Sequence, residues 1–278
     1  WGLGICQRLP LYKQGWQLMN WEKRVIIGGL PRSGSTLLRW HLDAAKEIIS
    51  PPETTFFQFL LSVNQDRLEA RSRRIDRALG VGTDVISEIL LKSVSSVEAF
   101  DELMSVWAEK LGLTASVWAE KTPWNCLSYH WLANEKIDLW FVSTIRDGRD
   151  VVTSQHWKKN RPYHCGVQRY VDAMRLIYDF QHPRHLIIKY EDLVRNTEDV
   201  LRNLFAAMGL SWDNDMLDAA CLESDTRKSK DDRQPLLNQK PTTLLINRWK
   251  GLEHEERVSE FTEHPEAMYW LEESGYLV

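Results

Sequence analysis

A glycine-bounded loop holds the residues with the clearest chemical potential. Residues 29–36 read Gly-Leu-Pro-Arg-Ser-Gly-Ser-Thr, which is the G-x-x-x-x-G spacing of a phosphate-binding loop with Thr36 at its Ser/Thr position. Such glycines let successive amides and the positive end of a following helix face an anion. Ser35 replaces the lysine that would reach a triphosphate, and Arg32 supplies a cation instead. The pattern predicts a site for a smaller anion, with an ordinary glycine turn as the alternative.

A second cationic segment, residues 145–154, reads Ile-Arg-Asp-Gly-Arg-Asp-Val-Val-Thr-Ser. Arg146 follows a predicted strand, at the edge where open α/β sheets place ligands. Ser154 comes eight residues later, about two helical turns on, so we expect it to share a helix face with Arg146. In the alternative reading, Asp147 only caps a helix and Asp150 is solvated.

Three further segments offer single candidates. Glu53 follows two prolines, and it either acts as a base or places an acid at the positive end of a helix. Lys121 ends a predicted strand, and its neighbour Glu120 is a reserve base that strand alternation places on the opposite face. Residues 247–251 read Asn-Arg-Trp-Lys-Gly, a basic pair before a glycine. Each segment is uninformative in isolation.

The elements that position these residues alternate between strands and helices. Apolar β-branched runs predict strands at 24–29, 117–120, 138–145 and 185–189. Helical spacing predicts helices after the loop at 37–42, from about 147, and at 197–208. This alternation predicts a parallel α/β sheet that is covered on both faces, in one domain over 1–278. We expect a lead-in at 1–22, a helical insertion at 56–112, and a polar segment at 223–240 that is either a solvated loop or closes over an anion.

Composition excludes several classes of protein. The chain has 278 residues, 43% of them hydrophobic, and a net charge of −4, so it is neither a disordered chain nor a basic nucleic-acid-binding protein. No apolar run in it is long enough for a membrane segment, and no stretch has the pattern of a signal peptide, so we expect neither. Four widely spaced cysteines favour the cytoplasm, whereas the Golgi lumen is the alternative if an anchor once preceded Trp1. No metal-ligand set and no GxSxG or HExxH motif is present.

The motifs taken together resemble the sulfotransferases that use 3′-phosphoadenosine 5′-phosphosulfate (PAPS). The branch that contains tyrosylprotein and many bacterial sulfotransferases is the most similar. The resemblance covers about residues 24–251 and implies a P-loop-containing three-layer α/β fold. It rests on the order of six segments: 31–36, 52–54, 120–123, 145–154, 189–192 and 248–251.

The resemblance also implies a role for each matching residue. The 5′-phosphosulfate would be bound by Arg32, Ser33, Gly34, Ser35 and Thr36. The 3′-phosphate would be bound by Arg146 and Ser154, and by the late segment of 223–251 through Lys250, Gly251 and, as a weaker candidate, Arg248. Tyr190 would contact the donor, Lys121 and Arg32 would stabilise charge at the sulfonate, and Glu53 would be the base.

The implied reaction is in-line transfer of a sulfuryl group to a hydroxyl acceptor, with the bisphosphate PAP as product and no metal required. The acceptor is a small molecule, a sugar or a peptide tyrosine. Two departures leave it open: Pro123 stands where cytosolic sulfotransferases have a histidine base, and residues 54–56 lack the basic residue of the tyrosylprotein branch. A P-loop small-molecule kinase using ATP and a non-catalytic nucleotide-binding module are the competing hypotheses. The sequence does not indicate an oligomeric state.

Overall fold

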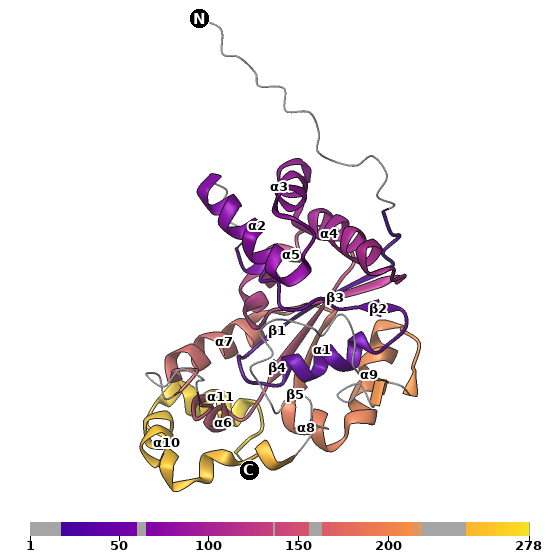
Figure 1. The fold of residues 1–278 in the computed structure, drawn as a ribbon. Helices are drawn as coiled ribbons and strands as arrows, with labels where there is room; N and C mark the ends of the chain where they lie inside the picture. Colours follow the sequence, from indigo (N-terminus) through magenta and orange to yellow (C-terminus); the bar gives the residue numbers. More distant parts are fainter. Residues whose placement is uncertain are drawn as a thin grey trace, which may run out of the picture.

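Five parallel strands form the central sheet, in the order β2-β3-β1-β4-β5 (Figure 1). The structure, a computed structural model, describes residues 18–59, 65–135, 137–155, 163–214, 216–217 and 243–277. The strands are β1 (Lys23–Gly29), β2 (Ile48–Ile49), β3 (Val117–Lys121), β4 (Leu139–Ile145) and β5 (His185–Lys189). The four predicted strands are present within one residue of their expected ends, and β2 is the strand that the sequence did not reveal.

The sheet is buried on both faces, which is why its strands are continuous apolar runs rather than alternating ones. Val25 and Ile27 of β1 point to one face and Ile26 to the other, and all three are completely buried. Strand β1 lies in the middle, where Ile27 pairs with Lys121 on one side and with Val142 on the other. This register brings the carboxyl ends of β1, β3 and β4 to one edge of the sheet.

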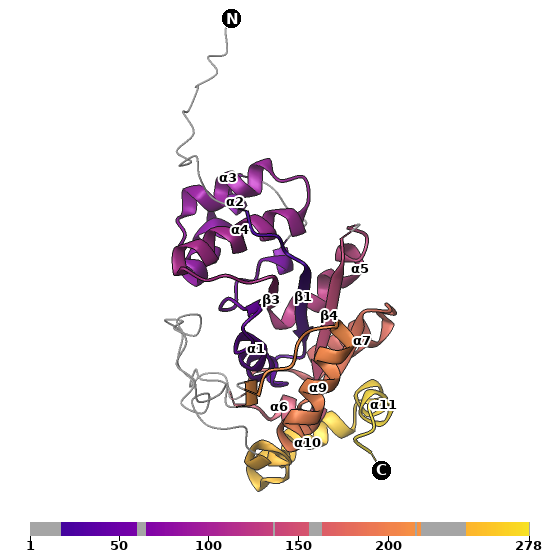
Figure 2. The same ribbon diagram turned by 90° about the vertical axis from the view of Figure 1, so that its right-hand side faces the viewer.

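Two groups of helices cover the two faces, and Figure 2 shows α1 and α7 on opposite sides of the sheet. Helices α1 (Ser35–Asp43), α8 (Tyr190–Arg195) and α9 (Thr197–Met208) pack on the face of Val25 and Ile27. The other face is covered by η2 (Pro123–Ser128), α5 (Tyr129–Leu132) and α7 (Val167–Asp179). The helices after the glycine loop and at 197–208 match the sequence prediction.

The region predicted as a helical insertion contains η1 (Phe57–Phe59), α2 (Gln65–Leu79), α3 (Thr83–Lys92) and α4 (Ser96–Leu111). The three α-helices lie together beyond one end of the sheet (Figure 1). Helix α4 has clear local signals at both ends: the Ser95 side chain accepts the Glu98 amide, and Gly112 takes a left-handed conformation after the last turn. The division of the chain into a lead-in, an insertion and a late loop stays a prediction.

The segments after β4 and after residue 242 meet near the carboxyl edge of the sheet. They comprise α6 (Gly148–Val152), η5 (Thr243–Leu245), η6 (Arg248–Lys250), η7 (Leu252–His254), α10 (Glu255–Thr262) and α11 (Pro265–Glu273). Residues 223–242 of the predicted donor-closing segment lie outside the described residues. In the part of the chain that is described, no helix has both the length and the apolar character needed to cross a bilayer.

Candidate functional site

The carboxyl end of every strand leads into a candidate site residue. Parallel strands end at one edge of a sheet, and ligands of open α/β folds bind there. The short strand β2, which the sequence did not reveal, is what brings Glu53 to this edge. The five strands, taken from β1 to β5, are followed or ended by Arg32, Glu53, Lys121, Arg146 and Tyr190.

The glycine loop is held tightly against β4 and α8. Gly29 has φ = 126°, and a Cβ there would lie 2.2 Å from the Thr144 carbonyl oxygen. Gly34 has φ = 85°, and a Cβ there would lie 2.4 Å from the Tyr190 ring. Only glycine fits both the conformation and the space at these two positions. Arg32 also has a positive φ of 70°, so the turn before α1 is tight over several residues.

The loop residues divide into those that shape the loop and those that face the site. The Ser33 hydroxyl is buried and donates to the Leu30 carbonyl at 2.5 Å and to the Thr144 carbonyl at 2.9 Å. Ser33 therefore fixes the loop to β4, and its side chain is not directed at a ligand. Ser35 and Thr36 begin α1, and the amides of a first helical turn have no partner within the helix. These amides are therefore free of helical partners at the place where helix N-termini accept anions.

Arg32 joins the loop to the second cationic segment. Its Nε donates to the Ser154 hydroxyl at 2.9 Å, and its carbonyl accepts from Arg146 Nη1 at 3.2 Å. Helix α6 is shorter than the spacing suggested and ends at Val152, so a turn after the helix brings Ser154 to Arg32. The two motifs that the sequence placed at opposite ends of one donor therefore adjoin each other directly.

Arg146 is largely buried and is held by several groups. Its guanidinium lies 4.5 Å from the centroid of the Tyr190 ring, a cation–π contact. Its Nη2 donates to Asp150 at 3.2 Å and to the Leu245 carbonyl. Its Nε is buried and has no hydrogen-bond partner among the described residues. A buried charged donor without a partner is costly, so this atom fits a site built to receive an anion.

Asp150 is a buried residue beside Arg146 that the sequence analysis did not single out. The alternative reading made it solvated, but it is only 3% exposed. Its two carboxylate oxygens accept the backbone amides of Asn247 at 2.9 Å and Trp249 at 3.0 Å, and one also accepts from Arg146. Asp147 does cap α6, as that reading expected. No local signal identifies Asp150, since its partners lie about a hundred residues later in the chain.

The late basic segment approaches the loop through Arg248. Burial lowers the pKa of Arg32 first, and the positive charges of Arg146 and Arg248 lower it further. Arg146 and Arg248 are therefore both close enough to Arg32 to repel its charge, which an anionic ligand would relieve. Lys250 is exposed and lies 5.5 Å from the centroid of the Trp249 ring, and Gly251 ends η6. The charge of Arg248, the weaker candidate, is thus one of the causes of the lowered pKa of Arg32, whereas the charge of Lys250 is not.

Lys121 and Glu53 form an ion pair, with Lys121 Nζ 2.7 Å from Glu53 Oε2. The lysine side chain is 6% exposed and that of the glutamate 43% exposed, so the carboxylate is the accessible partner. Burial raises the pKa of Glu53, but the charge and hydrogen bond of Lys121 oppose it. The charges of Arg74 and His164 act in the same direction as Lys121, and the pKa lies below its ordinary value. Glu53 is therefore ionised at neutral pH.

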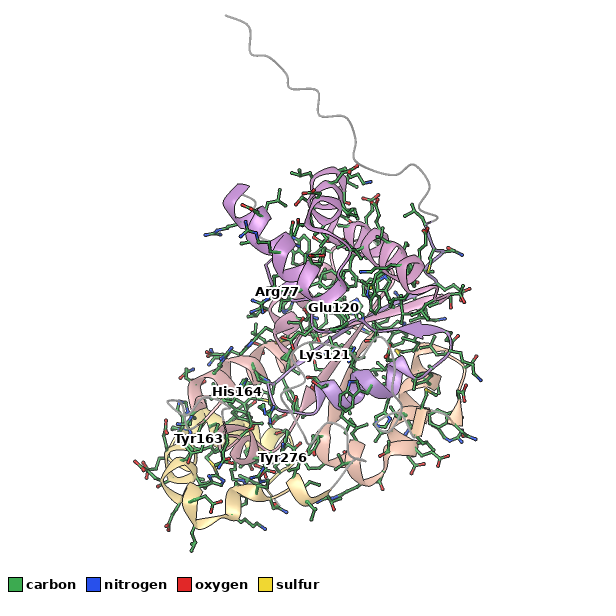
Figure 3. All side chains as sticks on the ribbon, in the orientation of Figure 1. Arg77, Glu120, Lys121, Tyr163, His164 and Tyr276 are labelled. Atoms are coloured by element: carbon green, nitrogen blue, oxygen red, sulfur yellow. The ribbon has the colours of Figure 1, made fainter. Side chains whose placement is uncertain are left out.

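Two residues near Glu53 had no sequence signal. Arg74 belongs to α2. His164 lies next to Ser154, because the His164 backbone amide donates a hydrogen bond to the Ser154 carbonyl at 2.9 Å. In the view of Figure 3, His164 lies between Lys121 and Tyr163, and Glu120 lies above Lys121. The open side of Glu53 is thus bordered by positive or ionisable groups from separate elements. Among the described residues, no group of three or more His, Cys, Asp or Glu side chains is arranged to hold a metal.

A comparison with known proteins identifies the class to which this fold and site belong. The sequence model of the sulfotransferase family matches residues 24–214, which contain every strand of the sheet and most of the site. The chain belongs to the sulfotransferase family. The predicted family and the predicted α/β fold are confirmed, and this favours the sulfotransferase interpretation over a kinase.

Individual relatives agree with the family assignment. The chain is 28% identical over 206 residues to protein-tyrosine sulfotransferase 2 of Gallus gallus, covering 69% of this chain and 53% of the relative. It is 34% identical over 137 residues to protein-tyrosine sulfotransferase 1 of Mus musculus, covering 49% and 34%. The chain thus spans about half the length, or less, of the curated relatives that it matches.

A solved structure supports the same fold. The sulfotransferase domain of the olefin synthase from Synechococcus PCC 7002 superimposes with a TM-score of 0.60 at 20% identity. The match covers 90% of this chain and 99% of that domain. At this level of identity the similarity describes the fold alone.

The favoured cytoplasmic location is wrong. The matching relatives are protein-tyrosine sulfotransferases, a class that does not fit the cytoplasm. Cysteine spacing was a poor guide because Cys126 and Cys165 are buried free thiols. Burial raises the pKa of each to about 11, and such thiols are inert in an oxidising or a reducing compartment alike.

Proposed function

We propose that this protein transfers the sulfuryl group of PAPS to a hydroxyl acceptor, with Glu53 as the base. The observation that carries the proposal is the junction of Arg32, Ser154 and Arg146 beside the Lys121–Glu53 pair. One anion site and one accessible carboxylate then lie at the same edge of the sheet. Family membership supports sulfuryl transfer, while the donor, the base and the in-line geometry are part of the proposal.

Donor binding is assigned to the clustered arginines and the loop amides. The amides of Ser35 and Thr36 would hold the 5′-phosphosulfate, and Arg146 with Ser154 would hold the 3′-phosphate. The unpartnered Nε of Arg146 and the lowered pKa of Arg32, caused by burial and then by the charges of Arg146 and Arg248, both fit a ligand with several negative charges. Tyr190 packs against Gly34 and Arg146 and so links the two subsites.

Charge stabilisation during transfer is assigned to Lys121 and Arg32. As the sulfur–oxygen bond to the donor phosphate breaks, negative charge grows on the leaving oxygen, and a fixed cation beside it lowers the barrier. Lys121 is well placed to hold its position because its side chain is almost fully buried and ends a strand. Lys121 is fixed at the end of β3, and Arg32 is fixed in the loop after β1 by its hydrogen bond to Ser154, so neither cation is a freely moving side chain in solvent.

Glu53 would accept the proton of the acceptor hydroxyl as that oxygen bonds to sulfur. Its lowered pKa keeps it ionised, and its exposed fraction leaves it open to an acceptor. General base catalysis of this kind contributes typically ~10²–10⁴-fold in rate. The acceptor is a hydroxyl group of a small molecule, a sugar or a peptide tyrosine, and a peptide tyrosine is the first to test because the curated relatives are protein-tyrosine sulfotransferases.

The donor is tested by thermal unfolding of the protein with adenosine 3′,5′-bisphosphate or with ATP and magnesium. A ligand that binds the folded state raises the unfolding temperature, so the bisphosphate should raise it and ATP should not. Stabilisation by ATP and magnesium without a preference for the bisphosphate would support the kinase instead.

The reaction is tested by transfer of labelled sulfate from PAPS to a panel of tyrosine peptides, phenols, sugars and alcohols. Wild-type protein should label at least one acceptor. Glu53→Gln should lower turnover ~10²–10⁴-fold, to a residual rate that single-turnover measurement detects, and leave bisphosphate binding intact. Unchanged turnover of Glu53→Gln removes that residue from its role. Bisphosphate binding with no labelled acceptor in the panel supports a non-catalytic nucleotide-binding module.

A further inference from the structure

Glu120 is a completely buried carboxylate next to Lys121 that the proposed reaction does not use. It lies on the opposite face of β3 from Lys121, as strand alternation predicts. Three neutral side chains surround it: Thr54 and Thr122 donate to Oε1 at 2.7 and 2.8 Å, and Asn125 donates to Oε2 at 2.5 Å. Burying a carboxylate among neutral groups is unfavourable, so the arrangement calls for a physical reason.

The direction of these hydrogen bonds is fixed by the backbone. The Thr54 hydroxyl accepts the Phe56 amide at 3.1 Å, and the Thr122 hydroxyl accepts the Thr55 amide at 3.0 Å. Each hydroxyl therefore directs its single proton at Glu120. The Asn125 amide nitrogen also donates, sharing its protons between Glu120 and the Ile27 carbonyl. All three neighbours are donors, so the cage is complementary to an ionised carboxylate.

Burial raises the pKa of Glu120, and the three hydrogen bonds lower it again only in part. The negative charge of Glu53 raises it further, so the two carboxylates repel each other. A charged Glu120 is therefore held in place at a cost. In proteins such buried polar networks are retained where they fix one specific arrangement of the chain.

The arrangement that Glu120 fixes is the turn directly after Glu53. Both backbone amides bound by the cage belong to this turn, at Thr55 and Phe56. Thr55 has φ = 54°, a conformation that is rare and strained for a β-branched residue. The turn needs outside support to keep this conformation, and the side chains of Thr54 and Thr122, which both donate to Oε1 of Glu120, supply it.

We propose that Glu120 is a positioning residue, which holds the 53–56 turn through Thr54 and Thr122 and so sets Glu53 against Lys121. The proposal rests on the proposed function, because it assigns Glu120 an effect through the base. The neighbouring residues Lys121 and Glu120 of β3 then act together. Lys121 pairs with Glu53 directly, and Glu120, on the opposite face of the strand, holds the 53–56 turn through Thr54 and Thr122.

The test is a double-mutant cycle with Glu120→Gln and Glu53→Gln, measured as single-turnover sulfate transfer from PAPS. In Glu120→Gln one acceptor becomes an amide donor that faces other donors, so the turn loosens. We expect at least a tenfold loss of rate in the wild-type background and no further loss in the Glu53→Gln background. Affinity for adenosine 3′,5′-bisphosphate should be unchanged, because the cage does not contact Arg32 or Arg146.

A matched pair covers the case in which Glu120→Gln does not fold. Thr54 and Thr55 are adjacent and buried, but only Thr54 touches Glu120, while the Thr55 hydroxyl donates to the Thr54 carbonyl. Thr54→Val should lose rate at least tenfold and depend on Glu53 in the same way, whereas Thr55→Val should lose much less.

The outcomes separate the two levels of the proposal. Normal turnover in Glu53→Gln contradicts the proposed base, whatever Glu120 does. A defect in Glu53→Gln, combined with equal losses from Glu120→Gln in both backgrounds, overturns the positioning role alone. Equal losses from Thr54→Val and Thr55→Val overturn it as well.

Discussion

Arg32 Nε donates a hydrogen bond to the Ser154 hydroxyl at 2.9 Å, although the two residues are 122 positions apart in the chain. The bond joins the glycine loop after β1 to the turn after α6. Because Arg146 also donates to the Arg32 carbonyl, the two subsites of the proposed donor share one continuous network. A substitution at either subsite should therefore change the affinity for the donor and not only the rate of transfer.

Arg146→Met tests the assignment of the 3′-phosphate. Hydrogen bonds to charged groups contribute about 1.5–3 kcal/mol, so affinity for adenosine 3′,5′-bisphosphate should fall roughly 10- to 100-fold. Affinity for adenosine 5′-phosphate, which lacks the 3′ group, should change much less. Calorimetric titration measures both, with Arg175→Met as a control because Arg175 forms an exposed pair with Glu266. Equal losses for the two nucleotides would contradict the assignment.

The pH dependence of transfer follows from the lowered pKa of Glu53. A base must be ionised to act, and a lowered pKa moves its protonation to lower pH, so the acid limb of kcat/KM should lie below pH ~4.5. Arg74→Ala removes one of the charges that lower this pKa, and the acid limb should move upward. Arg73→Ala is the matched control, since Arg73 is on the same helix but pairs with Glu69. An unmoved limb in Arg74→Ala, or equal shifts in both variants, would refute the explanation.

Gly34→Ala should weaken donor binding by distorting the loop. The new Cβ would lie 2.4 Å from the Tyr190 ring at a left-handed backbone position, so the loop, the ring or both must move. Gly112→Ala separates the two effects, because Gly112 also has a positive φ (66°) but has open space around it. Both variants should lower the free energy of unfolding, by about 1–2 kcal/mol for the left-handed backbone alone, and only Gly34→Ala should reduce bisphosphate affinity. Unaltered affinity in Gly34→Ala would show that the Tyr190 contact is not needed.

Asp150→Asn should loosen the 247–249 segment without unfolding the protein. An asparagine has one carbonyl oxygen in place of two carboxylate oxygens, so the amides of Asn247 and Trp249 can no longer both be satisfied. The loss of one hydrogen bond is worth about 1 kcal/mol, or roughly fivefold in bisphosphate affinity. Asp172→Asn is a surface control, because the hydrogen bond of the Asp172 carboxylate in the described part of the chain comes from the exposed Gln168 side chain. Amide hydrogen exchange should increase at 247 and 249, and protection equal to wild type would disprove the role.

The parts of the fold that could be predicted from sequence are those with a local signal. β-branched runs marked four strands, glycine spacing marked the loop, and helical spacing marked α9 to the residue. Strand β2 has only two residues, Ile48 and Ile49, and so has no periodicity to detect. Its absence from the prediction also hid why Glu53 reaches the sheet edge.

The parts of the site that sequence could not provide depend on distant partners. Asp150 looks like one charge among several in a polar run, and it is buried only because backbone amides from residues 247 and 249 meet it. Glu120 was placed on the correct face, and two of its donors, Thr122 and Asn125, follow it directly in the chain, but Thr54 comes from a turn 66 residues earlier. Long-range hydrogen bonds to the backbone leave no periodic trace in a single sequence.

The hold on residues 243–251 has a consequence for turnover. Neither η5 nor η6 contains a buried residue, and the described contacts of the segment include the Asp150 carboxylate, Arg146 through the Leu245 carbonyl, and Arg149, whose guanidinium lies 4.0 Å from the centroid of the Trp249 ring. Displacing it would leave all five strands intact. Release of the proposed nucleotide product would therefore require the rupture of these contacts at one corner of the molecule, without a change in the sheet that carries Lys121 and the glycine loop.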